Sequence, residues 1–224
     1  MKILLSSLAK ISSRLDLAPS WSSDYTEISQ LYMRKQIVKV DVTRLSQNRL
    51  VNRRVETSYS TNDIDIEKNA LSITANYIHS YDSILSYTMI ELYLKNKLTS
   101  IPYYGTIHDC FLCDLTYSNN LLKDYHTSFY KIFNNPIVPI NNIICITLEY
   151  NHAQMHTPID ITILNSHINN LRNKYTNLTK PQVIAFNKNV ELFLSSYESI
   201  INKSLSNQQH FWDIFKTHPG RSLT

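Results

Sequence analysis

The amino-acid sequence predicts an α+β fold with a small antiparallel sheet, a separate β-hairpin and packed helices. Apolar residues recur at helical spacing between residues 78 and 92, which indicates a long helix. Residues 27–59 hold short stretches of extended character, typical of antiparallel strands. Two runs rich in Tyr, Ile, Thr and Phe flank Asp109 as the strands of a hairpin would. The 224 residues are enough to bury one substantial core.

A helix and two or three antiparallel strands are expected at the start of the chain. Residues 2–14 place apolar side chains on one helical face, and Pro19 ends this segment. Extended segments follow at residues 27–32, 36–42 and 50–59. Residues 1–60 hold ten of the 22 Lys and Arg residues and five of the 18 acidic ones, so basic side chains are expected on one face of these strands.

A long helix is expected in the middle of the chain. Thr61 to Glu67 offers capping residues followed by acids, which is typical of a helix start. The apolar spacing that follows predicts a helix over His79 to Leu98. Pro102 ends this helix and begins the hairpin.

The last ninety residues are expected to be mainly helical. Pro136 and Pro139 are expected to break the chain, and Ile143 to Leu148 reads as a short β-like run. Trp212 closes a last amphipathic turn. Helical patterns cover residues 119–133, 159–171 and 181–205.

Composition and charge narrow the class of protein. The net charge of +4 is mildly basic, and its concentration near the start of the chain favours contact with phosphates, although a solvated strand surface gives the same pattern. Only 2 Gly residues stand against 15 Tyr, a bias that indicates an AT-rich gene of an organelle or selfish element. No apolar run approaches the roughly 20 residues of a membrane span, so no membrane is expected among the partners.

Two weaker patterns with metal-ligand spacing are better explained by a structural role of their residues than by metal binding. Cys110 and Cys113 form a Cys-x-x-Cys, but no second pair exists, and a spacing of three along a strand points the thiols to opposite faces. His152 and His156 have zinc-enzyme spacing, but residue 153 is Ala rather than Glu, and Pro158 shortens any helix.

The hairpin at residues 103–113 carries the strongest chemical signal. Its first strand leads to Asp109, and a second apolar run leads away from it. A buried unpaired carboxylate is costly, so Asp109 at this turn is expected to bind a cation. Two imidazoles accompany it, His108 beside it and His79 on the preceding helix.

The helix and the hairpin together resemble the C-terminal palm of single-subunit DNA-directed RNA polymerases of bacteriophages and mitochondria. The matching segments are Asn76-Tyr-Ile-His-Ser80 and His108-Asp-Cys-Phe111, in the family's order and with a helix between them. A third match is a Trp-x-Ser segment before an Ile-x-Gln-x-Tyr strand, at positions 21–32. The resemblance covers residues 17–115. It implies a partial polymerase palm over residues 1–133, followed by a mainly helical extension of the same domain over 134–224.

The resemblance implies roles for five residues. Asp109 is similar to one of the two catalytic carboxylates that hold Mg²⁺, the cofactor of this family. His108 is similar to the residue that supports the primer terminus, and His79 to the one that touches the template–primer minor groove. Asn76 and Lys68 are expected to bind nucleic acid beside it. An exposed turn aspartate, packed histidines or a helix-capping role for His79 are the structural alternatives.

Other family features have no counterpart in the chain. The first catalytic aspartate, the fingers helix with its Lys and Tyr-Gly pair, and the N-terminal promoter-binding region are missing. Ala75 stands where Pro usually precedes the Asn, and Ser83 to Leu85 replaces a usual His or Ser pair. One carboxylate cannot build a two-metal site, so this chain alone is expected to be a catalytically incomplete fragment.

The implied activity is transcription by ribonucleotidyl transfer. Its partners would be a DNA template, an RNA 3′ end, ribonucleoside triphosphates and the missing N-terminal polymerase part, in a mitochondrion (organellar genome or linear plasmid). A non-catalytic nucleic-acid-binding or decayed remnant of a polymerase is the alternative. A related DNA polymerase is disfavoured, since Cys110 stands where that family has Glu.

Overall fold

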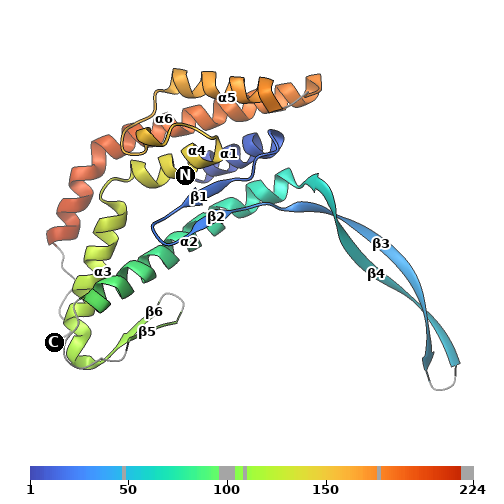
Figure 1. Cartoon of the computed structure of the whole chain (residues 1–224), viewed down its shortest axis with the longest axis horizontal. Helices are drawn as coiled ribbons and strands as arrows, with labels where there is room; N and C mark the ends of the chain where they lie inside the picture. Colours follow the sequence, from blue (N-terminus) through green and yellow to red (C-terminus); the bar gives the residue numbers. More distant parts are fainter. Residues whose placement is uncertain (47–48, 96–103, 108–109, 176–177, 218–224) are drawn as a thin grey trace.

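The computed structural model describes residues 1–46, 49–95, 104–107, 110–175 and 178–217. Within these ranges the chain is α+β, as the sequence predicts, with six α-helices and three two-stranded antiparallel sheets. The helices form the body of the molecule, and one long two-stranded ribbon projects from it (Figure 1). The expected small sheet is therefore divided into three separate strand pairs.

The first helix, α1 (Lys2–Arg14), has the predicted bounds and lies at the centre of the body. It packs against both α2 and α6. Leu4, Leu5, Leu8 and Ile11 are fully buried. Each such side chain contributes about 1.5–3 kcal/mol through removal from water, so the apolar face of this helix is a main source of stability.

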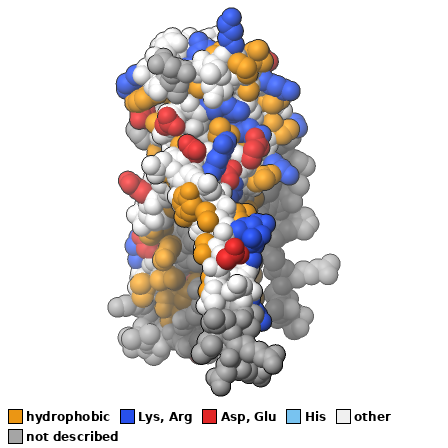
Figure 2. Space-filling view, turned by 90° about the vertical axis from the view of Figure 1, so that its right-hand side faces the viewer, with side chains coloured by type: hydrophobic (Ala, Val, Ile, Leu, Met, Phe, Trp, Pro, Cys, Tyr) orange, Lys and Arg blue, Asp and Glu red, His pale blue; other side chains and the backbone are white. Residues whose placement is uncertain are grey.

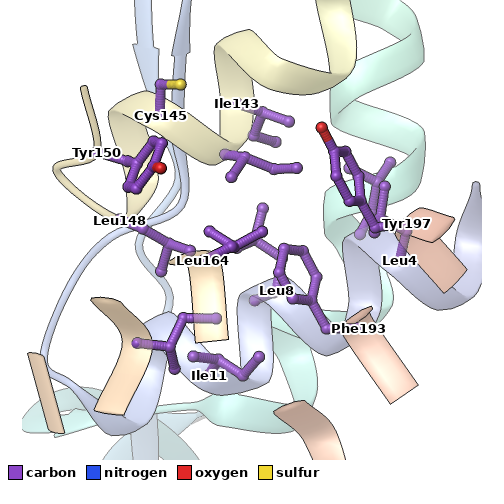
Figure 3. Close-up of a cluster of buried hydrophobic side chains, with 14 of the residues drawn as sticks. Leu4, Leu8, Ile11, Ile143, Cys145, Leu148, Tyr150, Leu164, Phe193 and Tyr197 are labelled. Carbon is purple, nitrogen blue, oxygen red and sulfur yellow. The ribbon is translucent and has the colours of Figure 1, made fainter. Parts of the chain in front are cut away.

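One apolar core joins the first helix to the last part of the chain. It lies between α1, α4 (Ile137–Thr147), α5 (Ile161–Tyr175) and α6 (Lys180–Thr217). Figure 3 shows Leu8, Ile143 and Phe193 pointing toward one another in this core. The predicted boundary between residues 133 and 134 stays a prediction, and the two parts share this core.

The predicted β-like run at residues 143–148 is wrong, because residues 143–147 belong to α4 and Leu148 is its C-cap. Pro136 is the N-cap of this helix and Pro139 lies in its first turn, where a missing N–H breaks no helical hydrogen bond. A short apolar run does not distinguish a strand from a helix that is buried on most sides. Most of α4 is buried, including Ile140, Ile143 and Ile144.

Asn141 of α4 is a fully buried polar residue with every group satisfied. Its Nδ2 donates to the carbonyl oxygens of Gln154, Met155 and Thr157 at 3.0, 3.3 and 2.7 Å. Its Oδ1 accepts from the Tyr197 hydroxyl at 2.7 Å. This side chain ties the loop before α5 to α6.

The first strand pair is short and attaches to α4. β1 (Ser20–Ser22) pairs antiparallel with β2 (Glu27–Ser29), with Trp21 opposite Ile28. The free edge of β1 bonds to side chains of α4: Ser20 N donates to Thr147 Oγ1, and Ser22 N donates to Asn142 Oδ1, both at 2.9 Å.

The second strand pair is the projecting ribbon. β3 (Met33–Ser46) and β4 (Arg49–Ile64) pair antiparallel along almost their whole length. The strands expected at residues 36–42 and 50–59 are confirmed and are longer than predicted. No described side chain of the ribbon is buried.

The long helix α2 (Ile66–Lys95) follows the ribbon. It begins at the predicted start signal, where Lys68 N donates to Asp65 Oδ1 at 3.0 Å. The helix therefore covers the expected segment from His79 as far as Lys95 and extends 13 residues before it. The expected end at Leu98 and Pro102 lies outside the described residues. Its buried side includes Ile73, Tyr77 and Met89.

The remaining elements complete one side of the body. The hairpin expected at residues 103–113 is confirmed as β5 (Tyr104–Ile107) and β6 (Cys110–Cys113). The short 3₁₀-helices η1 (Leu115–Tyr117) and η2 (His152–Gln154) precede and follow the pair α3 (Ser118–Phe133) and α4. Over the described residues, no helix combines the length and apolar character needed to cross a membrane.

Candidate nucleic-acid interface

A groove runs between the first strand pair and α2. It has a volume of about 460 Å³, and its lining comes from two of the segments singled out in the sequence. The strand side supplies Trp21, Gln30 and Tyr32, and the helix side supplies Asn76 and His79. Residues that are 44 or more positions apart in the chain thus form one surface.

Hydrogen bonds across this groove join Gln30 and Tyr32 to α2. Asn76 Nδ2 donates to Gln30 Oε1 at 2.7 Å and to Tyr32 Oη at 3.3 Å. Gln30 Nε2 donates to the carbonyl oxygen of Asn69 at 2.9 Å, and Tyr32 N donates to Asn69 Oδ1 at 3.0 Å. Gln30 is only 5% exposed, so these bonds replace water that the side chain has lost.

A second contact between the same elements is made by Trp21. Its Nε1 donates to Ser80 Oγ at 2.8 Å, and its ring meets Tyr77 edge-on at 5.5 Å between ring centroids. Ser80 Oγ in turn donates to the Tyr77 carbonyl oxygen at 2.6 Å. Burial raises the pKa of Tyr77 well above its usual value, so this ring stays neutral.

His79 is exposed on the ridge between this groove and a second hollow. The second hollow has a volume of about 690 Å³ and lies between α2, β6 and α3, where Ile78, Asp82, Phe111 and Tyr125 also line it. The His79 imidazole forms no hydrogen bond with any residue that the structure describes, Asp82 included. The imidazole therefore has both ring nitrogens available to a ligand.

Lys68 lies near the start of α2 with its side chain exposed. Its Nζ stands over the Tyr32 ring at 4.6 Å from the centroid, a cation–π contact. Through Tyr32, Lys68 belongs to the same surface as Asn76. The structure thus brings three predicted binding residues, Lys68, Asn76 and His79, along one side of α2.

The two residues on which the catalytic prediction depends, His108 and Asp109, lie outside the described residues. The strands that flank them are described, and Ile107 pairs with Cys110. On β6, Cys110 is exposed and Cys113 is partly buried, which agrees with thiols on opposite faces.

Aromatic side chains attach this hairpin to the body. The Tyr104 ring of β5 stacks on Tyr93 of α2 at 4.9 Å, and Tyr93 meets Tyr117 edge-on at 5.1 Å. The Tyr117 hydroxyl donates to the buried Asp124 carboxylate at 2.5 Å. Burial, together with the nearby charge of Asp124, raises the pKa of Tyr104 to about 12.

Sequence reasoning did not find this tyrosine cluster. Tyr93, Tyr104 and Tyr117 come from three elements, and nothing in their spacing marks them as neighbours. The hydrogen bond between Gln30 and Asn76 was not predicted either, although each residue belongs to a segment that resembles the family. The high Tyr content was the available signal, since large aromatic rings tend to pack against one another.

The ribbon supplies a charged surface next to the groove. Basic, acidic and hydrophobic side chains lie interspersed on the side toward which it projects (Figure 2). The strand register places Lys35, Lys39 and Arg54 on one face of the ribbon and Arg53 on the other. The expectation that the basic side chains share one face is therefore wrong. Ion pairs join Lys39 to Glu56 and Arg54 to Asp41, each at 3.0 Å.

The two metal-binding patterns of the sequence lie on β6 and at η2. Among the described residues, no three His, Cys, Asp or Glu side chains come together as a metal site would require. His156 follows η2 in a turn rather than continuing a helix, so the helical His-x-x-x-His face does not form there.

A family model described as "DNA-dependent RNA polymerase" matches residues 18–217 of this chain. The match includes the groove, the ribbon, α2 and the hairpin. The chain therefore belongs to the DNA-dependent RNA polymerase family, of the single-subunit phage and mitochondrial type, as its resemblance predicted.

A relative from Zea mays, named "Probable DNA-directed RNA polymerase", is 26% identical over 129 residues. The aligned region is 55% of this chain and 12% of the maize protein. The chain is thus similar to a small part of a much longer relative.

Proposed function

We propose that this chain is the C-terminal palm portion of a DNA-directed RNA polymerase, and that it binds a DNA template paired with an RNA 3′ end along α2. One observation carries the proposal: three separate family-like segments come together around His79 of this helix. Gln30 bonds to Asn76, Trp21 bonds to Ser80, and Phe111 of the hairpin shares a hollow with His79.

The groove offers contacts suited to the sugar edge of a duplex. An RNA–DNA duplex presents hydroxyl and base-edge groups in a wide, shallow minor groove, which a single exposed imidazole can reach. His79 supplies both donor and acceptor groups for such a contact. Lys68, exposed about three helical turns away, is positioned to meet a phosphate. These contacts recognise shape and backbone rather than base sequence, as a polymerase that copies any template requires.

The proposed chemistry is template-dependent transfer of a ribonucleotide from its triphosphate to the RNA 3′ end. Bound Mg²⁺ ions would supply charge neutralisation at the attacking hydroxyl and the leaving pyrophosphate. Asp109 fits this ion by its donor type, since carboxylate oxygen is the ligand that Mg²⁺ prefers. It supplies one carboxylate of the pair. In the proposal, the other comes from the missing N-terminal part of the polymerase, and His108 supports the RNA terminus.

The proposal includes the origin of the chain. The alignment to a small part of the maize relative supports a fragment of a larger polymerase. The AT-rich residue usage supports a gene in a mitochondrial genome or linear plasmid. The nucleotide sequence upstream of the codon for Met1 tests the first point: an in-frame or frameshifted continuation with polymerase motifs is expected.

Reconstitution tests the catalytic part of the proposal. This chain is mixed with an upstream polypeptide that carries the other catalytic carboxylate, and extension of a labelled RNA primer on a DNA template is measured with Mg²⁺. Extension is expected only in the mixture and is expected to be lost with Asp109→Asn. Asp114→Asn is the matched control and should retain extension. Extension that survives Asp109→Asn would refute the assignment.

A non-catalytic nucleic-acid-binding remnant is the rival function. It rests on the exposed side chains of His79 and Lys68 on α2, because binding of nucleic acid through them needs no metal ion. In that case the mixture would bind the primer–template with a steep salt dependence but would not extend it, with or without Mg²⁺.

A further inference from the structure

We propose that Gln30, Tyr32 and Asn76 form a positioning lock that sets the orientation of His79 toward bound nucleic acid. Asn76 is then a positioning residue that acts through His79, rather than a direct contact. This inference rests on the proposed function, because it assumes that a duplex lies along α2.

The donors of Asn76 are already used within the protein. A side-chain amide carries two N–H groups, and Asn76 Nδ2 donates to Gln30 Oε1 and Tyr32 Oη. A ligand could gain these donors only by breaking the bonds. Asn76 is moreover only partly exposed, whereas His79, one helical turn further on, is exposed. The imidazole is thus the better placed of the two for direct contact.

Gln30 spans two turns of the helix at once. Its Oε1 accepts from Asn76 while its Nε2 donates to the carbonyl oxygen of Asn69, seven residues earlier. One buried amide therefore fixes α2 against the end of β2 through two residues that lie about two helical turns apart in the sequence. Such a pair of bonds permits only one rotation of α2 relative to the strand.

A different rotation of α2 about its axis would change the direction in which the His79 imidazole points. Asn76 and His79 are three residues apart and lie side by side on the helix surface. His79 borders both the groove and the second hollow, so rotation of α2 carries it toward one or the other. Buried polar bonds of this kind contribute little net stability but select one arrangement. The lock is therefore expected to affect binding geometry more than folding.

Binding of a fluorescein-labelled RNA–DNA hybrid tests the lock. The variants are His79→Ala, Asn76→Ala, Gln30→Met, which keeps the side-chain length without the hydrogen bonds, and the Gln30→Met/Asn76→Ala double variant. Each is expected to weaken binding about five- to tenfold, the effect of losing one well-placed contact. The double variant should be no weaker than either single variant. His79→Ala should cost little further affinity in the Asn76→Ala background.

Controls separate positioning from misfolding. Asn202→Ala, an exposed asparagine within α6, should bind like the parent chain. Tyr32→Phe removes only the hydroxyl that accepts from Asn76, and it replaces Gln30→Met in the test if that variant does not fold. The His79 ring resonances in NMR spectra should move in every folded lock variant, which a purely structural role distant from His79 would not produce.

Two results would overturn the inference while leaving the proposed function intact. One is weaker binding with Asn76→Ala but not with Gln30→Met or Tyr32→Phe, which would make Asn76 a direct contact. The other is weaker binding with His79→Ala alone. If His79→Ala itself binds like the parent chain, the proposed groove is wrong, and this failure is recognisable by the unchanged affinity of that variant.

Discussion

The body and the ribbon of this molecule are stabilised in different ways. In the body, side chains of α1, α4, α5 and α6 fill one apolar core, and Leu8, Ile143 and Phe193 are fully buried. In the ribbon, β3 and β4 pair with each other, and no described side chain is buried. A two-stranded ribbon with both faces in water gains little from burial, so its side chains remain available to a partner. The difference separates residues that hold the fold from residues that can bind.

Removal of a large core side chain should have the greatest effect. Phe193→Ala is expected to lower the free energy of unfolding by about 3–5 kcal/mol, because it leaves a cavity between α1 and α6. Val40→Ala in the ribbon is the matched control, since Val40 is 42% exposed, and should cost less than about 1 kcal/mol. Urea unfolding followed by circular dichroism measures both. Equal losses would contradict the contrast between body and ribbon.

Removal of the buried Asn141 amide should have the second-largest effect on the free energy of unfolding. Asn141→Ala leaves the Tyr197 hydroxyl and three carbonyl oxygens without this partner, at a cost of about 3 kcal/mol in unfolding free energy. The same unfolding measurement applies. Asn52→Ala in the ribbon, which loses one exposed hydrogen bond to Thr43, is the control and should be nearly neutral.

Alkaline pH should destabilise the body through Tyr197. Burial raises its pKa to about 12, whereas an unfolded tyrosine ionises near 10. Between these values the unfolded state has released a proton that the folded state retains, so stability falls as pH rises from about 10 to about 12. Unfolding free energy measured against pH should decline less steeply in Tyr197→Phe. An unchanged slope in that variant would show that Tyr197 does not contribute.

Substitution of two neighbouring ribbon arginines should have the smallest effect on stability and separates their roles in binding. The Arg53 side chain forms no ion pair or hydrogen bond with a described residue, whereas the Arg54 side chain is paired with Asp41. Each alanine variant should change stability by no more than about 0.5 kcal/mol, because both residues are exposed. If the ribbon meets phosphates, Arg53→Ala should reduce the salt dependence of nucleic-acid binding by about one phosphate contact, and more than Arg54→Ala does. Identical salt slopes for the parent chain and both variants would exclude the ribbon as a phosphate-binding surface.

The sequence predicted the elements whose signals are local. The bounds of α1 and the start of α2 just after Asp65 followed from apolar spacing and capping residues. The run at residues 143–148 was misjudged, because a helix buried on most sides has no period to reveal it. The sequence predicted individual residues of the candidate site but not the contacts between them. The bond between Gln30 and Asn76 depends on packing across 46 positions, which one sequence does not display.

The central claim is that nucleic acid lies along α2 rather than along the ribbon or α6. Photo-crosslinking from a 4-thiouridine at the RNA 3′ end of a primer–template, followed by peptide mapping, tests this claim most directly. The proposed function predicts crosslinks to α2 around His79 or to β6, and their loss when unlabelled primer–template competes. Crosslinks confined to α5 or α6, on the other side of the core, would contradict it.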